Sequence, residues 1–157
     1  MKKSIFKNLA TGICVVLLTA FSSCSKDDDN TPSPSDGRNA KFTVTVTDAP
    51  ASAYISFVIV GLTKNPNDAT VWKVNGVVQN NQNAVSLGKN EFSGSTKTYV
   101  IESVKPLQAI TVGAQCLNVE NLPYKISYKA EINGEIKTDQ KDFSVTKNAD
   151  FTKDYTY

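Results

Sequence analysis

Cysteine and carboxylate side chains are the groups in this sequence that could carry out chemistry, because histidine is absent. Histidine is the most frequent general base in enzymes and the most frequent metal ligand. Without it, neither a Ser–His–Asp nor a Cys–His arrangement can be built. The cysteines are Cys14, Cys24 and Cys116, and there are 15 Asp and Glu residues.

The acidic residues show no spacing that indicates catalysis. Asp48, Glu91, Glu102 and Glu120 fall in expected loops or at expected strand ends, and nothing places two of them across a cleft, as glycoside hydrolysis requires. Neither GxGxxG nor GxxxxGK[ST] occurs. The loop at residues 65–68 could offer oxygen ligands to calcium, but an ordinary Asx turn is the preferred interpretation. We therefore expect no catalytic residues, no metal centre and no cofactor.

The first 23 residues have the order of a secretory signal peptide. Lys2, Lys3 and Lys7 precede a mostly apolar run from Leu9 to Phe21, and small serines follow. As a helix, this run would be about 20 Å long, whereas a bilayer core is ~30 Å thick, so a transmembrane anchor is the weaker interpretation. Removal of the segment leaves 14 basic and 15 acidic residues. That balance gives no basic surface for nucleic acid.

The residues around Cys24 resemble a lipid-attachment site. Phe21-Ser22-Ser23-Cys24 resembles the lipobox of bacterial lipoproteins, in which the cysteine is acylated and becomes the new N-terminus. The next residues, Ser25-Lys26-Asp27-Asp28-Asp29, resemble the export signal of surface-exposed lipoproteins of the Bacteroidota. The resemblance implies a lipid anchor in the outer membrane and a domain that faces outside. A solvated charged spacer is the alternative for residues 25–29.

Three segments follow from this order: a signal peptide at 1–23, the lipidated cysteine with a flexible tether at 24–40, and one domain at 41–157. Residues 25–39 contain no aliphatic or aromatic side chain, so nothing there offsets the entropy of ordering. Cys14 leaves with the signal peptide and Cys24 is acylated, so Cys116 has no disulfide partner. Its place in an alternating run predicts a buried, inert thiol.

The domain is predicted to be all-β. Apolar residues recur with a period of two in many short runs, and no window has the helical spacing with caps. Asn75-Gly76 and Asn133-Gly134 are hairpin signals. Val58 and Val60 make one strand apolar on both sides, which is typical of a buried central strand. We expect a single antiparallel β-sandwich of about seven to nine strands, with a small barrel as the alternative.

The run from Trp72 to Val78 resembles the W-x-x-N-G hairpin of immunoglobulin-like and PKD-like bacterial surface domains. In those domains, the tryptophan packs between the sheets. The resemblance implies an immunoglobulin-like sandwich.

Aromatic side chains are the remaining candidates for ligand binding, because sugars stack on exposed rings. The candidates are Trp72, Tyr155 and Tyr157, although Trp72 is better explained as core. The amide-rich run at residues 79–83 is best explained as a soluble turn. We expect a non-catalytic, lipid-anchored binding or scaffold protein of the cell envelope, with an envelope protein or a glycan as partner. The alternatives are a glycan-binding accessory lipoprotein and a small envelope hydrolase or hydrolase inhibitor.

Overall fold

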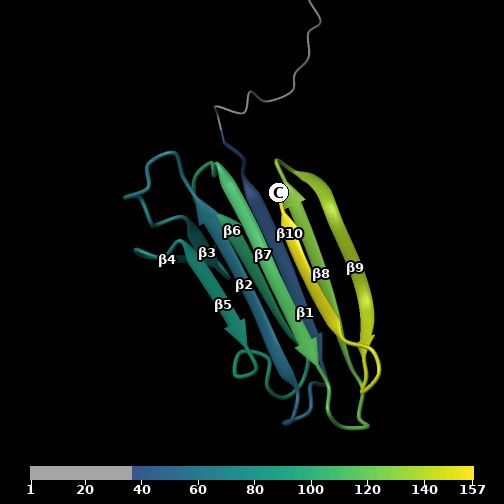
Figure 1. Ribbon diagram of the computed structural model, residues 1–157. Coiled ribbons are helices and arrows are strands. Elements are labelled where there is room, and N and C mark those ends of the chain that lie inside the picture. Colours follow the sequence, from purple (N-terminus) through teal and green to yellow (C-terminus); the bar gives the residue numbers. More distant parts are fainter. Residues whose placement is uncertain (1–36) are drawn as a thin grey trace, which may run out of the picture. The chain divides into compact units, whose positions relative to one another are not determined.

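The structure, a computed structural model, describes residues 37–157. These residues form ten strands and no helix, in two antiparallel sheets that face each other (Figure 1). The all-β prediction is confirmed, and two separate sheets favour the sandwich over the barrel. No helix among residues 37–157 is long and apolar enough to cross a membrane. The predicted signal peptide, the lipidated Cys24, the export segment Ser25–Asp29 and the tether up to residue 36 lie outside the described residues.

The larger sheet has six strands in the order β4-β3-β6-β1-β8-β9. Neighbouring strands pair antiparallel, with β1 between β6 and β8. Their bounds are β1 Ala40–Thr47, β3 Trp72–Val74, β4 Val77–Gln79, β6 Lys97–Ser103, β8 Tyr124–Ile132 and β9 Glu135–Val145.

The smaller sheet has four strands in the order β10-β7-β2-β5. β7 is central and pairs with both β2 and β10. Their bounds are β2 Tyr54–Leu62, β5 Ala84–Gly88, β7 Ala109–Leu117 and β10 Phe151–Thr156. The chain passes back and forth between the sheets, so each sheet is built from segments that are distant in the sequence.

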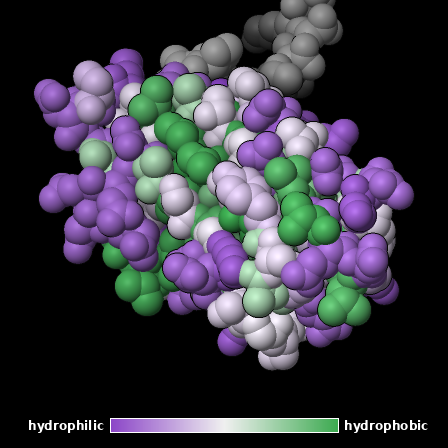
Figure 2. Space-filling model, turned by 60° about the horizontal axis from the view of Figure 1, so that its bottom comes forward, coloured by the Kyte–Doolittle hydropathy of each residue, from purple (hydrophilic) through white to green (hydrophobic). Residues whose placement is uncertain are grey.

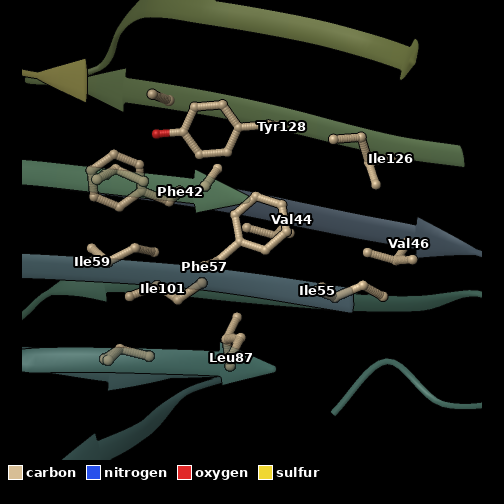
Figure 3. Close-up of a cluster of buried hydrophobic side chains, with 14 of the residues drawn as sticks. Phe42, Val44, Val46, Ile55, Phe57, Ile59, Leu87, Ile101, Ile126 and Tyr128 are labelled. Carbon is tan, nitrogen blue, oxygen red and sulfur yellow. The ribbon is translucent and has the colours of Figure 1, made fainter. Parts of the chain in front are cut away.

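The period-two pattern of the sequence produces the core between the sheets, because alternate side chains of each strand point to the same face. Figure 3 shows side chains from both sheets meeting in this layer. Phe42 stacks on Tyr128, and Phe57 meets the same ring from the other sheet. The largest fully buried side chains are Trp72, Tyr124, Tyr128, Phe42, Phe57, Phe92, Phe151, Ile59, Ile101, Leu107, Ile110 and Ile126.

Both Asn-Gly hairpins form as predicted, and each turn attaches to a neighbouring strand. Asn75 and Asn133 adopt positive φ angles of 48° and 50°, and the glycines that follow are also positive. This is the geometry of a type I′ turn. The side-chain Oδ1 of Asn75 accepts a hydrogen bond from the amide of Val100, and that of Asn133 accepts one from Asn39. Each turn therefore reverses the chain and also forms a hydrogen bond to a neighbouring segment of the same sheet.

Two features differ from expectation. The segment 135–145 forms one eleven-residue edge strand, β9, with two register irregularities against β8, and the total of ten strands exceeds the predicted seven to nine. No residue of β9 from Glu135 to Asp142 is buried, and Lys137, Asp139 and Lys141 recur there at every second position, so the apolar period is missing. The second difference concerns β2: it is an interior strand, but Val58 is 38% exposed on the outer face of its sheet.

Candidate functional site

The two outer faces of the sandwich differ in chemistry. On the six-stranded sheet, many outward side chains are charged or carry hydroxyls, and several of them pair with one another, although Val78 and Ile136 are also exposed on this face. Lys73 lies 3.2 Å from Glu102, and Lys129 lies 3.1 Å from Glu131. The hydroxyls of Thr45 and Thr98 are 2.9 Å apart. This face has the composition of an ordinary solvated surface.

The outer face of the four-stranded sheet is almost uncharged. The register of its strands places one charged residue, Asp154, at the outward positions. β2 contributes an apolar row to this face, in which Tyr54 is 50%, Val58 38% and Leu62 46% exposed. Figure 2, which brings the lower end of the view in Figure 1 forward, shows hydrophobic surface open to solvent among hydrophilic groups. Exposed apolar groups gathered on one face mark a candidate interaction surface.

A shallow, open depression lies in the middle of this face, with a volume of about 310 Å³. It arises because Gly113 of β7 has no side chain, while its neighbours Val58 on β2 and Asp154 on β10 do. A Cβ at position 113 would sit 3.4 Å from Asp154 Oδ1. The lining residues are Ser56, Val58, Gly113, Ala114, Gln115, Thr152 and Asp154.

The polar side chains of the depression are free to bind something else. Ser56, Gln115 and Thr152 lie in one row across β2, β7 and β10, and Asp154 lies in the next. Within residues 37–157, these four side chains make no hydrogen bond or ion pair. They supply a carboxylate, an amide and two hydroxyls, that is, acceptors and donors together. The contrast with the paired groups of the opposite face is the main local argument for a site.

Trp72, one of the three aromatic candidates for ligand binding, lies in the core with 0% exposure. Its ring packs edge-on against Phe42, and its Nε1 donates to the carbonyl of Asn83 at 3.0 Å. Gly61 is required beneath it, because a Cβ there would come within 2.6 Å of Trp72 Cζ2. The structure therefore gives this ring the packing role that the hairpin resemblance implied, with no face open to a ligand.

Tyr155 and Tyr157 are partly buried against the core. Tyr155 stacks on Tyr128 with centroids 5.1 Å apart and lies nearly parallel to Tyr157. The Tyr157 hydroxyl lies 2.9 Å from that of Thr138 and 3.2 Å from that of Tyr128. These contacts attach the end of the chain to the larger sheet. Because the rings are engaged with one another, they do not form an open stacking platform.

Cys116 is fully buried, and it is the free cysteine among the described residues. Burial raises its thiol pKa to about 12, although hydrogen bonds from the Ser56 backbone and from Tyr124 oppose the shift. Burial also raises the pKa of Tyr124 and Tyr128. A thiol held neutral at physiological pH is a poor nucleophile, as predicted from the sequence.

The acidic residues considered for catalysis or metal binding form no shared site in the described part of the chain, and several have structural partners. Glu91 accepts from the amide of Gly88 at 2.7 Å, and Glu102 pairs with Lys73. In the loop considered for calcium, Asn65 Oδ1 accepts from the amide of Asn67, which is an Asx turn, and both Asp68 oxygens contact Lys105. Among residues 37–157, no three Cys, Asp or Glu side chains gather in a way that could hold a metal.

The depression was not predicted from the sequence. In the sequence, the outward-facing polar residues of one strand cannot be distinguished from those of another. Which of them become neighbours depends on the strand order of the folded sheet. One signal was available: Val58 and Val60 are apolar at positions where the alternation calls for polar residues. That pattern predicts a strand buried on both faces, but in the structure Val58 belongs to the exposed apolar row of β2.

Comparisons with known proteins support the fold. No family model matches the chain, and no curated protein matches it. A solved structure described as the calcium-bound form of a protein from Parabacteroides distasonis is similar, with a TM-score of 0.53, 16% identity, and coverage of 83% of this chain and 99% of that chain. DUF4425 proteins from Bacteroides ovatus and Bacteroides vulgatus have TM-scores of 0.52 and 0.54. Each is 13% identical and covers 78% of this chain and 94% of its own. At these identities, the likeness concerns the fold alone.

Proposed function

We propose that this protein is a non-catalytic binding protein of the bacterial envelope that uses the outer face of the four-stranded sheet as its binding surface. The observation that carries the proposal is the contrast between the two outer faces. One carries many charged side chains, several of them paired, with Val78 and Ile136 exposed between them. The other is nearly uncharged, has an exposed apolar row, and surrounds a depression with unpaired polar groups.

We propose that a lipid on Cys24 holds the domain at the outer membrane, facing outside, after removal of residues 1–23. The support is the lipobox-like run before Cys24 and the Ser25–Asp29 segment behind it. The bacterial sources of the similar structures agree with this setting. We also propose that the sandwich is a relative of the immunoglobulin-like surface domains whose hairpin it resembles.

Catalysis is the less favoured function. The depression contains a single carboxylate, Asp154, whereas glycoside hydrolysis uses two. The calcium of the Parabacteroides distasonis structure belongs to that protein. The loop considered for calcium in this chain already uses its aspartate to bind Lys105, so calcium forms no part of the proposal.

Photo-crosslinking in intact cells tests the binding face. A benzophenone amino acid is placed at Ser86, beside the depression, or at Thr98 on the opposite sheet; both positions are exposed. Ser86 is chosen because it does not line the depression. We expect discrete adducts from Ser86 and none from Thr98. Equal adducts from both positions, or none from Ser86, would contradict the proposal.

Membrane fractionation tests the anchor. The Cys24→Ala variant should lose lipid attachment and leave the membrane fraction, because several acyl chains are needed for stable anchoring. Protease treatment of intact cells, with and without residues 26–29, then tests outward display. Membrane retention of Cys24→Ala would contradict the lipid anchor. Unchanged surface display after deletion of residues 26–29 would contradict their role as an export signal.

A further inference from the structure

We infer that the depression over Gly113 binds a short stretch of a neutral, hydroxyl-rich glycan. This inference rests on the proposed function, because it names the ligand of the same face. It is built on the geometry of the outward positions of β2, β7 and β10.

The polar groups of the depression match the needs of sugar hydroxyls. Each hydroxyl of a sugar is both a donor and an acceptor. Asp154 supplies acceptors, Gln115 supplies both kinds of group, and Ser56 and Thr152 add hydroxyls that can rotate to suit a ligand. None of these side chains has a partner among the described residues, so no internal hydrogen bond must break when a ligand binds.

The apolar surroundings match the other side of a sugar ring. The C–H groups of a pyranose pack on apolar and aromatic surfaces. Tyr54 and Val58 lie on the same face of β2 as Ser56, and both are exposed. Val58 lies four positions after Tyr54 along the strand, a distance of about 13 Å at ~3.3 Å per residue. The outer face of β2 from Tyr54 to Val58 is therefore long enough for a short oligosaccharide rather than a single sugar.

The charge of the face selects for a neutral ligand. Asp154 is the single charged outward residue of the four strands, and no lysine or arginine stands beside it at the outward positions. An acidic polysaccharide would bring carboxylates against Asp154, and none of the residues that line the depression is a cation. Repulsion of that kind lowers the affinity for the wrong ligand.

The depression exists because Gly113 has no side chain, so a substitution at this position can fill it. Its φ angle is not in the positive region, and an added Cβ would have one near neighbour, the Asp154 carboxylate, at 3.4 Å. Gly113→Val should therefore fill the space without harming the fold, since valine suits a strand better than glycine. The unfolding temperature should stay the same or rise.

Affinity electrophoresis tests the inference with the detergent-solubilised full-length lipoprotein. The native gels contain a soluble β-glucan, an α-glucan, a mannan, a xylan or, as the acidic probe, polygalacturonate. We expect retardation by at least one neutral polysaccharide. Gly113→Val, and separately Gln115→Ala, should weaken it roughly tenfold or more. Thr98→Ala, on the opposite sheet, should leave it unchanged.

Three results would overturn the inference: no retardation by any neutral polysaccharide, retardation that survives both Gly113→Val and Gln115→Ala, or strongest binding to polygalacturonate. The Gln115→Ala variant keeps the test valid if Gly113→Val fails to fold. If the gels show no binding while crosslinks from Ser86 join the protein to another polypeptide, the binding face stands and the glycan is wrong. If neither experiment gives a signal, both proposals fail.

Discussion

At the residue scale, burial decides what the one described cysteine can do. Cys116 lies inside the smaller sheet, and its neighbours include the Ser56 backbone and Tyr124. Desolvation favours the neutral thiol, so the folded state holds its proton more tightly than the unfolded chain does. Ionisation of the Cys116 thiol should therefore lower the free energy of unfolding.

This predicts a specific dependence of stability on pH. The thiol pKa rises from its ordinary value of 9.0 to about 12 in the folded protein. The stabilising contribution is therefore complete below pH 9 and is lost as pH rises from 9 towards 12. In that window, the free energy of unfolding should fall by about 1.4 kcal/mol per pH unit for this group. Tyr124 and Tyr128, whose pKa values are also raised, add to the slope above pH 10.

Urea unfolding at pH 7, 9, 10 and 11 measures this slope. The Cys116→Ala variant lacks the thiol, so its stability should change less between pH 9 and 10 than that of the parent. Identical slopes for the two proteins would show that the thiol does not titrate in this way.

A second residue-scale prediction concerns Gly61, which lies beneath the buried tryptophan. A Cβ at this position would meet Trp72 Cζ2 at 2.6 Å and Leu107 Cδ1 at 2.8 Å. Gly61→Ala should therefore lower the free energy of unfolding by about 1–3 kcal/mol through overpacking. Thermal unfolding measured beside Gly113→Val provides the comparison, because an added Cβ there meets only the Asp154 carboxylate, at 3.4 Å. Equal effects of the two changes would contradict the packing argument.

At the element scale, the Asn-Gly turns combine two functions that a single pair of variants can separate. Asn75 has a positive φ angle, and its side chain accepts from Val100 on β6. Asn75→Ala removes the hydrogen bond and strains the backbone, which should cost about 2 kcal/mol. Asn75→Gly removes the bond but tolerates the φ angle, so it should cost about half as much. Denaturant titration distinguishes them, and equal losses would mean that backbone strain is negligible here.

The sequence predicted correctly those elements whose conformation depends on the backbone preferences of a few adjacent residues. Asn75-Gly76 and Asn133-Gly134 predicted hairpins because their backbone preferences are local. β9 was incompletely predicted because Lys137, Asp139 and Lys141 recur along its first part, where no buried residue sets an apolar period. The depression depends on Gly113 lying between Val58 and Asp154, residues far apart in the chain, and that neighbourhood is set by strand order.

At the scale of the whole molecule, both ends of the described chain lie near the start of β7. Arg38 exchanges backbone hydrogen bonds with Leu107, and the amide of Tyr157 donates to Ile110. The chain therefore enters the sandwich at one end (Figure 1), and both outer faces run away from that point. The place where the described chain begins and ends therefore does not distinguish the two outer faces, and their chemistry must do so.

The two outer faces are proposed to have different roles in the cell, and this is the central claim. Thr111 and Thr98 form a matched pair for testing it, because both are exposed threonines on interior strands of the two sheets. Thr111→Cys and Thr98→Cys are labelled with a membrane-impermeant maleimide. Background is low because Cys116 is buried and Cys24 is proposed to be acylated.

In the purified protein, the two cysteines should react at similar rates. In intact producing cells, Thr111→Cys should react several-fold more slowly than Thr98→Cys, because a bound partner covers the uncharged face. An unchanged ratio of the two rates between purified protein and cells would contradict the account.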